Sequence, residues 1–456
     1  MSNPIDAITA GLKRGGATRA YNFPGFHSHE IAAGLGMTQI SLNERTAYAE
    51  AYGACVAGAR AVVTFKNVGL NVAADAFLHS IIGGVGAGLV VIVTDDTLVV
   101  GSQEFQDSRH YADFYGGLWF DPADPQDAYD IAKAAFSLSE QFDVPVVIRL
   151  SGQYFDSDDP FFDEDEVSVR APAHTALMPE RHVVHPYYYR EQAKRLEKKR
   201  RAIAGYVETC APSIPAKTPH GVIVCGAASY TGDDDVLHLS TIPIPAKIVA
   251  KFLETHDTVT VYEDGDPYVK HLVAQIGSRA TVVSAPQQER GVRTKFVKWK
   301  AYESIFSHIN EVLTGTYVAG DITQFTVETT DTIGVALSLG VAVGTAIGMA
   351  DVAGEAYAIV GDTSFLHEGK GIVQEAQKRG VHVGIIIIDN AMSWCTGGQQ
   401  AADDLNQTMA QYQSWTVDAR DGDVGKLKTA LASMRDASGV SIVRVLVPYV
   451  APIVRN

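Results

Sequence analysis

The chain has few cysteines, and they lie far apart. Its 456 residues contain four, at Cys55, Cys210, Cys225 and Cys395, and no two have the C-x-x-C spacing of zinc or iron–sulfur sites. The wide separation of the four cysteines excludes a cysteine-ligated iron–sulfur cluster or zinc knuckle built by this chain alone. It also gives no sign of a disulfide framework, so we expect a reducing, cytoplasmic setting.

Positive charge is also scarce. Lys and Arg total 37 against 53 Asp and Glu, which gives a formal net charge of -16 at pH 7. A balance this acidic argues against nucleic acid or an anionic membrane as a partner. The first residues do not read as a signal peptide, and no apolar run is long enough to span a membrane. The hydrophobic content of 46% is that of an ordinary globular protein.

Alternating apolar strands and helices fill residues 1 to about 150. Three apolar runs, Ala61–Phe65, Gly88–Thr94 and Val144–Leu150, have the composition of buried strands. Short helices rich in small residues, such as Thr46–Gly58, accompany them. This pattern predicts a doubly wound parallel α/β unit.

The rest of the chain predicts two further units of the same α/β class, because the length allows about three domains of roughly 150 residues each. The acidic segment Asp156–Glu166 has the composition of a solvated linker, and a smaller unit begins near residue 218. The third unit starts near residue 300 and contains a predicted helix rich in Gly and Ala over Gly334–Ala350. The predicted domains are residues 1–165, 166–295 and 296–456.

Two predicted strands in the third unit end in polar side chains. Asp362 follows the apolar run Glu355–Gly361, and Asn390 follows Val383–Asp389, with room for one crossover helix between them. In a right-handed βαβ unit both side chains emerge at the same edge of one parallel sheet. Their oxygens suit a hard divalent ion that also holds phosphate oxygens. The alternative is that they merely end two strands.

The surrounding segments are more specific. Residues 361–369 read Gly-Asp-Thr-Ser-Phe-Leu-His-Glu-Gly, and residues 389–399 read Asp-Asn-Ala-Met-Ser-Trp-Cys-Thr-Gly-Gly-Gln. Together they resemble the magnesium–diphosphate signature of thiamine diphosphate enzymes. The resemblance implies that Asp362, Asn390 and a backbone carbonyl near Met392 hold Mg²⁺. The other residues assigned to cofactor binding are Gly361, Thr363, Asp321, Cys395 and Thr396.

Glu44 follows Asn43 at a predicted strand-to-helix junction. By itself, a carboxylate in the first turn of a helix is simply favoured by the helix dipole. The likeness to thiamine diphosphate enzymes implies more, because their chemistry needs a carboxylic acid beside the aminopyrimidine ring of the cofactor. There the acid donates to a ring nitrogen and promotes loss of the thiazolium C2 proton. Glu44 is therefore predicted to be both catalytic and cofactor-binding.

Over nearly its whole length the chain resembles the large subunit of indolepyruvate:ferredoxin oxidoreductases, within the 2-oxoacid:acceptor oxidoreductases. The resemblance implies a pyrimidine-binding, a transketolase-C-terminal-like and a diphosphate-binding domain, in that order. The matching segments are Asn43-Glu44, Gly58–Arg60, Lys66–Ala73, Ser102-Gln103, Gln106–Arg109, Gly226–Tyr230, Ile242–Lys247, Gly320–Ile322, Asp331-Thr332 and residues 361–399.

The chain departs from this family where electrons and substrate are handled. It carries no ferredoxin-like domain with clustered cysteines, and Lys298–Tyr302 stands where a cysteine-and-histidine cluster is usual. Pro24–Ser28 replaces a Pro-Gly-Thr-Pro-Ser loop, so Phe26 removes a hydroxyl expected near the substrate. Without cysteine ligands, an oxidative decarboxylation needs a separate subunit for its electrons, or the reaction takes a non-oxidative course.

The resemblance also supplies candidates for proton transfer. His27 lies in the substrate loop, and His367 lies five residues beyond Asp362; His29 is a weaker candidate. The alternative for each is an ordinary histidine that is solvated or satisfied in the core.

Lys66 and Arg109 are candidates for binding a substrate carboxylate, with structural ion pairs as the alternative. Asn67 stands where the family has a histidine, and Gln103 is followed by Glu104-Phe105 rather than Asn-Glu. The predicted substrate-binding residues are Phe26, His27, Lys66, Asn67, Gln103 and Arg109.

The sequence therefore predicts an enzyme that uses thiamine diphosphate and Mg²⁺ to convert a bulky or aryl 2-oxo acid by decarboxylation or carboligation, without an iron–sulfur cluster. Two alternatives stay open: an indolepyruvate-type oxidoreductase subunit that passes electrons to a separate partner, and an inactive cofactor-binding partner subunit. Because thiamine sites usually lie between domains of different protomers, the resemblance implies a homodimer or larger homo-oligomer. A small second subunit is possible.

Overall fold

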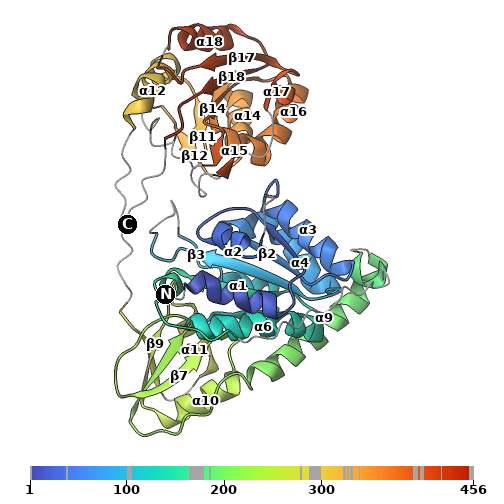
Figure 1. The fold of residues 1–456 in the computed structure, drawn as a ribbon, viewed down its shortest axis with the longest axis vertical. Coiled ribbons are helices and arrows are strands. Elements are labelled where there is room, and N and C mark those ends of the chain that lie inside the picture. Colours follow the sequence, from blue (N-terminus) through green and yellow to red (C-terminus); the bar gives the residue numbers. More distant parts are fainter. Residues whose placement is uncertain are drawn as a thin grey trace. The chain divides into compact units, whose positions relative to one another are not determined.

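Parallel strands joined by helices build the described chain, as the alternating apolar runs predict (Figure 1). The chain divides into a first unit, Met1–Arg293, and a second unit, Thr294–Asn456. None of the described helices is long and apolar enough to cross a membrane. The computed structural model describes residues 3–36, 40–99, 105–163, 179–183, 186–277, 280–286, 299–321, 325, 328, 332–337, 339–393, 399–400, 405–422 and 424–450.

The first unit contains a six-stranded sheet with the order β1-β2-β3-β5-β4-β8. Neighbouring strands are parallel except β4 and β8. All seven residues of β3 are buried, and Leu89–Val93 form the apolar run that a strand covered on both faces needs. The predicted strands are confirmed as β2, β3 and β5. The strands are β1 (Arg19–Asn22), β2 (Ala61–Lys66), β3 (Leu89–Asp95), β4 (Leu118–Phe120), β5 (Val146–Ser151) and β8 (Thr241–Ile242).

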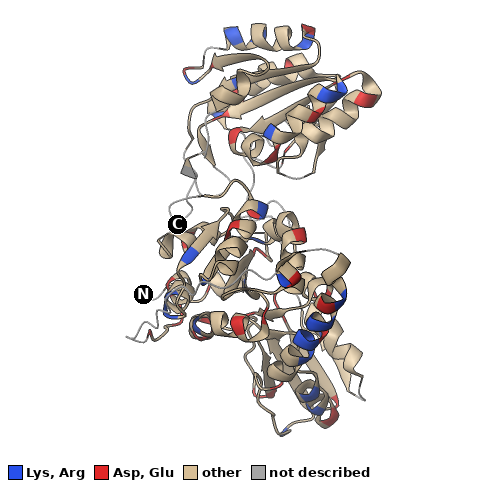
Figure 2. Ribbon diagram, turned by 90° about the vertical axis from the view of Figure 1, so that its right-hand side faces the viewer, with Lys and Arg blue, Asp and Glu red and all other residues tan. Residues whose placement is uncertain are grey.

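Side-chain caps begin several helices of this unit. Asn3, Asn43 and Asp124 each accept a hydrogen bond from a backbone N–H in the first turn that follows. Helix α1 packs along α6 (Figure 1), and Lys and Arg positions follow one another along α9 (Figure 2). The helices are α1 (Pro4–Arg14), α2 (Ser28–Gly34), α3 (Glu44–Val56), α4 (Asn67–Gly83), α5 (His110–Tyr115), α6 (Pro125–Phe142), α7 (Gly152–Phe155), α8 (Pro179–His182) and α9 (Pro186–Val207).

A second, four-stranded parallel sheet completes the first unit, with the order β10-β9-β6-β7. One continuous apolar core joins this sheet to the six-stranded one, and β8 from this stretch of chain pairs with β4. The predicted boundary between residues 165 and 166 stays a prediction. The elements are β6 (His220–Cys225), β7 (Asp235–Leu239), α10 (Ala246–Thr255), β9 (Thr258–Tyr262), α11 (Tyr268–Ile276) and β10 (Thr281–Ser284).

The second unit is built on a six-stranded parallel sheet with the order β12-β11-β13-β14-β18-β17. Two separate apolar clusters pack against it, which is the expected core of a doubly wound unit. The strands are β11 (Val318–Gly320), β12 (Val335–Ala336), β13 (Glu355–Gly361), β14 (His382–Asp389), β17 (Gln413–Asp418) and β18 (Val440–Leu446), with the small β15 (Met392–Ser393) and β16 (Gln399–Gln400) pairing separately.

One predicted helix of this unit is wrong at its start. The small-residue helix α14 begins at Ala342 rather than Gly334, because Val335 and Ala336 form β12 and pair with β11. A run of small residues fits either conformation, so tertiary pairing decides. The helices are α12 (Lys300–Leu313), α14 (Ala342–Ala353), α15 (Asp362–Ser364), the π-helical turn η1 (Phe365–Gly369), α16 (Lys370–Arg379), α17 (Leu405–Met409) and α18 (Gly425–Asp436).

Candidate functional site

Asp362 and Asn390 lie at the same edge of the second unit's sheet. Strands β13 and β14 are parallel neighbours, with Gly361 opposite Ile388. Asp362 follows β13 and Asn390 follows β14, and both side chains are buried, with 3% and 6% of their surface exposed. The apolar runs thus place two polar side chains where parallel strands end, which is the usual position of ligand sites in open α/β sheets.

The Asp362 carboxylate has one oxygen committed and one available. Its Oδ1 accepts hydrogen bonds from the backbone N–H and the hydroxyl of Thr363, at 2.6 and 3.3 Å. Its Oδ2 is buried and has no hydrogen-bond partner among the described residues. Burial, assisted by the neighbouring Asp389 carboxylate, raises the pKa of Asp362 to about 7. A buried carboxylate in this state is costly unless a cation compensates it, so the residues present fit a metal site.

The turn after β14 is fixed by its own side chains. Asn390 Oδ1 accepts from the backbone N–H of Met392 (3.0 Å), and Asp389 Oδ1 accepts from that of Ala391 (2.8 Å). Ala391 adopts a left-handed φ of 58°, which is uncommon for a residue with a side chain and often occurs at functional sites. Arg444 Nε holds the other Asp389 oxygen at 2.6 Å. Sequence reasoning missed this ion pair, although Asp389 directly precedes Asn390.

Asp321 ties three parts of the second unit together. It follows β11 and is 1% exposed. Its Oδ1 accepts from the backbone N–H of Ala342 at the start of α14 (2.8 Å), and its Oδ2 accepts from the Ser364 hydroxyl. Ser364 Oγ in turn accepts from Gly340 N (3.2 Å). Burial raises the pKa of Asp321. The carboxylate therefore anchors the start of α14 beside Asp362, and its role toward a cofactor stays a prediction.

His367 lies on the π-helical turn η1, which continues α15 beyond Asp362. Such turns are rare and often occur at functional sites. The imidazole is 4% exposed, and a Cβ added at Gly340 would lie 3.0 Å from its Nδ1. His367 therefore packs against the loop that leads into α14. Two other predicted cofactor residues, Cys395 and Thr396, lie outside the described residues.

Glu44 is a buried acid at the start of α3 in the first unit. Asn43 caps this helix, accepting from the backbone N–H of Thr46 at 2.8 Å, and the Glu44 side chain is 6% exposed. It packs directly on Gly69 of α4, where an added Cβ would lie 2.5 Å from Glu44 Cγ and 2.9 Å from Oε1. A glycine at position 69 is therefore required to accommodate this carboxylate.

Phe26 and His27 belong to an aromatic cluster. The His27 ring stacks on Phe155 at 4.2 Å between centroids, and Phe26 meets both rings edge-on. His27 Nδ1 lies 3.0 Å from Glu30 Oε2, and this hydrogen bond lowers the pKa of Glu30. His29 Nδ1 lies 3.3 Å from the Gly25 carbonyl. Sequence reasoning missed Phe155, which reaches the cluster from a helix distant in sequence.

The predicted substrate ligands are in different environments. Lys66 ends β2 and packs against Gly25, whose added Cβ would lie 2.6 Å from Lys66 Cβ. Asn67 is 1% exposed and its amide donates to the Gln106 carbonyl at 2.8 Å. Gln103 lies outside the described residues.

Arg109 is fully buried. Its guanidinium donates to Asp107 at 2.6 Å, to Glu263 at 3.0 Å and to the Asp266 carbonyl at 3.0 Å. These contacts are those of the ion-pair alternative, and a substrate role for Arg109 stays a prediction.

Residues 320–448 match the protein family described as "Thiamine pyrophosphate enzyme, C-terminal TPP binding domain", and Asp362 and Asn390 fall within them. Proteins named indolepyruvate oxidoreductase subunit IorA match beyond this stretch. That of Methanothermobacter thermautotrophicus is 31% identical over 293 residues, covering 57% of this chain and 46% of that protein. That of Archaeoglobus fulgidus is 26% identical over 471 residues, covering 86% and 75%. The chain is therefore similar to thiamine diphosphate enzymes over residues 320–448 and to the IorA proteins over a longer stretch.

These relatives confirm the resemblance and the fold class that the sequence predicts. The chain spans about half the length of the first relative. Among solved structures, 2-oxoglutarate:ferredoxin oxidoreductase from Magnetococcus marinus is 13% identical with a TM-score of 0.46, covering 62% of this chain and 61% of that chain. Benzoylformate decarboxylase from Polynucleobacter necessarius is 14% identical with a TM-score of 0.31, covering 99% and 100%.

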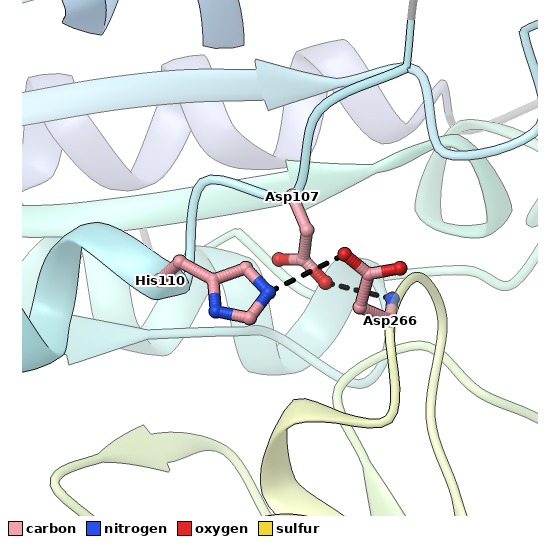
Figure 3. Close-up of side chains that lie close together, drawn as sticks. All are labelled: Asp107, His110 and Asp266. Atoms are coloured by element: carbon pink, nitrogen blue, oxygen red, sulfur yellow. Dashed lines mark hydrogen bonds and ion pairs between the residues drawn. The ribbon is translucent and has the colours of Figure 1, made fainter.

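One group of described side chains has the spacing of metal ligands, and its members belong to the first unit. Asp107, His110 and Asp266 bring ligand atoms within 4.8 Å of one another (Figure 3). Both Asp107 oxygens, however, already accept from Arg109, and Oδ2 also accepts from the Asp266 backbone N–H at 2.9 Å. An arginine in this position repels a cation, so the group is better described as part of a buried ionic cluster.

Proposed function

We propose that the chain binds thiamine diphosphate through Mg²⁺ and decarboxylates a 2-oxo acid. The proposal is carried by Asp362 Oδ2, which is buried at the strand edge where Asn390 emerges and has no hydrogen-bond partner in the described part of the chain. It is supported by the match of residues 320–448 to a thiamine pyrophosphate-binding family and by relatives named as 2-oxo acid oxidoreductase subunits.

Oxygen ligands would hold the metal. In this proposal Asp362, Asn390 and a backbone carbonyl near Met392 bind Mg²⁺, which prefers such ligands together with phosphate oxygens. Gly361, Thr363 and Asp321 would line the diphosphate. When bound, thiamine diphosphate would supply a carbon nucleophile and an electron sink for the electron pair that remains on the substrate carbon when carbon dioxide leaves.

The first unit would supply proton transfer and substrate binding. Glu44 would supply the carboxylic acid that the aminopyrimidine ring needs, and its burial on Gly69 keeps the carboxyl group in one place. His27, paired with Glu30, and the buried His367 hold or move protons near the reacting carbon. Phe26 offers an aromatic surface to a bulky or aryl substrate.

After decarboxylation the reaction can take an oxidative or a non-oxidative course, and different observations support each course. The names of the relatives favour an oxidative course, in which a partner takes the electrons. The four scattered cysteines favour the non-oxidative course that the sequence predicts, because this chain alone offers no set of cluster ligands. The relatives give the oxidative course the greater weight.

The Glu44→Gln variant tests the proposal. We expect it to lower kcat on arylpyruvates by roughly 10²–10⁴-fold, the usual contribution of a positioned acid or base, while thiamine diphosphate still binds. Glu50→Gln is the matched control, since Glu50 lies exposed on the same helix. Equal turnover by wild type and Glu44→Gln would refute the proton-relay role.

Product analysis separates the two fates. With phenylpyruvate or indolepyruvate and a dye acceptor, reduction of the dye that depends on coenzyme A indicates the oxidative course. Aldehyde or acyloin formed without dye reduction indicates the non-oxidative course. Absence of any turnover under both conditions, with cofactor bound, indicates the inactive-subunit alternative.

A further inference from the structure

A cavity of about 150 Å³ opens at the carboxyl edge of the four-stranded sheet in the first unit. The chain leaves β6 for β7 on one side and reaches β9 on the other, so the strand order reverses between β6 and β9. Open α/β sheets bind ligands in the crevice outside such a reversal. The residues that follow β6 and β9, including Ser229 and Asp264, line this cavity together with Thr97 from the turn after β3.

Thr97 marks the cavity as a binding site rather than a packing gap. Its side chain is 1% exposed, and its hydroxyl has no hydrogen-bond partner among the described residues. An unpartnered buried hydroxyl is uncommon because it loses its hydrogen bonds to water without replacement. The hydroxyl lies against Gly152, where an added Cβ would approach it to 3.5 Å. A polar ligand in the cavity would supply the hydrogen bond that the Thr97 hydroxyl lacks among the described residues.

The charge around the cavity selects a cation. Its described lining residues include the carboxylates of Glu263 and Asp264 but no Lys, Arg or His. Phosphate-bearing ligands, which usually occupy such crevices, would therefore meet like charge.

A buried ionic cluster behind the cavity adds to this field. The guanidinium groups of Arg109 and Arg149 face more carboxylates than they can neutralise. The five carboxylates of the cluster have buried side chains and are Asp95, Asp107, Asp121, Glu263 and Asp264.

We propose that this crevice binds a small organic cation carrying a primary ammonium group, which Asp264 and the Thr97 hydroxyl receive. None of its lining residues is among those proposed to bind thiamine diphosphate or the 2-oxo acid, so the inference goes beyond the proposed function. A metal ion is the poorer occupant, because the described group with metal-ligand spacing includes only residues outside the lining.

Calorimetric titration of the full chain with 1,4-diaminobutane tests the class of ligand, with 1,4-butanediol as the uncharged analogue of equal length. We expect saturable binding of the diamine and none of the diol. Equal binding of both, no saturable binding of the diamine, or binding of adenosine monophosphate in its place would overturn the proposal. The titration requires neither cofactor nor turnover, so its result is independent of the proposed catalytic function.

Two substitutions test the residues. Thr97→Val and Asp264→Asn should each weaken diamine binding by roughly ten- to a hundredfold, the value of a hydrogen bond to a charged group. Thr97→Val should not lower the Tm of the unliganded protein, because the hydroxyl has no partner to lose. Asp266→Asn is the matched control in the same loop, since Asp266 does not line the cavity. Unchanged affinity in both test variants, or an equal loss in the control, would refute the assignment.

Discussion

At the scale of single residues, Asp362 combines burial, an uncommitted oxygen and a shifted pKa. In the folded, metal-free protein its pKa is about 7, against an ordinary value of 3.8. The folded state therefore keeps a proton on this carboxyl that the unfolded state has lost between these two pH values. By linkage, the contribution of this protonated carboxyl to the free energy of unfolding is fully present below about pH 4 and is lost as the pH rises through 7.

This linkage predicts the behaviour of Asp362→Asn. The amide keeps an acceptor for Thr363 but cannot ionise, so the variant should lack part of the fall in unfolding free energy that wild type undergoes from pH 5 to pH 8. Urea denaturation in the presence of a chelator measures the difference at the two pH values. The variant should also lose magnesium-dependent binding of thiamine diphosphate.

Asp351→Asn is the control for this experiment, because Asp351 is exposed on the neighbouring helix α14. It should follow the wild-type pH dependence. Identical pH dependence of wild type and Asp362→Asn would contradict the raised pKa, and unchanged cofactor affinity in Asp362→Asn would contradict the metal assignment.

At the scale of elements, the close approach of α3 and α4 determines the position of the Glu44 side chain, which packs on Gly69. Gly69→Ala would place a Cβ 2.5 Å from Glu44 Cγ, so the carboxylate or the helix must move. We expect a loss of about 1–3 kcal/mol in unfolding free energy, typical of overpacking, together with reduced turnover. Chemical denaturation and steady-state kinetics measure the two effects.

Gly53→Ala is the matched helical control. Nothing lies within 4 Å of a Cβ added at Gly53 of α3. Alanine there should stabilise the helix by up to about 1 kcal/mol and leave turnover unchanged. A Gly69→Ala variant as stable and active as wild type would show that the carboxylate tolerates displacement.

The start of α14 depends on another carboxylate, Asp321. Asp321→Ala removes the acceptor for Ala342 N and for the Ser364 hydroxyl, leaving buried donors unpaired. We expect a loss of about 1–3 kcal/mol for each buried donor left without a partner, measured by urea denaturation. Asp321→Asn, which keeps one carbonyl acceptor, should lose less. Equal stability of Asp321→Ala and wild type would contradict the anchoring role.

At the scale of the whole molecule, Glu44 and Asp362 belong to different units. The resemblance to thiamine diphosphate enzymes implies that a site draws its pyrimidine-side acid and its metal ligands from different protomers. Mixing Glu44→Gln with Asp362→Asn should then restore up to about a quarter of wild-type turnover, because half of randomly assorted dimers contain one intact site of two. The mixture is refolded or coexpressed and assayed against each variant alone.

Light scattering at micromolar concentration gives the accompanying measurement of mass. A homodimer or larger assembly is expected. A monomer, or a mixture with no more activity than its components, would contradict a site shared between protomers.

The sequence by itself determined the class of the molecule, its principal buried strands and the two polar residues at the ends of β13 and β14. These features follow from local pattern. A parallel strand buried on both faces is a nearly continuous apolar run, and the polar residue that follows it lies at the carboxyl edge of the sheet, where ligand sites of open α/β sheets are found. Local pattern also explains the error at α14, where Gly and Ala are compatible with strand and helix alike. Only pairing with β11 assigned Val335 and Ala336 to a strand.

Tertiary structure alone decided what each candidate side chain contacts. It places Glu44 on Gly69, pairs Asp389 with Arg444 and Arg109 with buried carboxylates. It also leaves the Thr97 hydroxyl without a hydrogen-bond partner among the residues described. The reason is physical: hydrogen-bond satisfaction and charge balance depend on atoms brought together from distant segments, and no spacing within the chain records those distances.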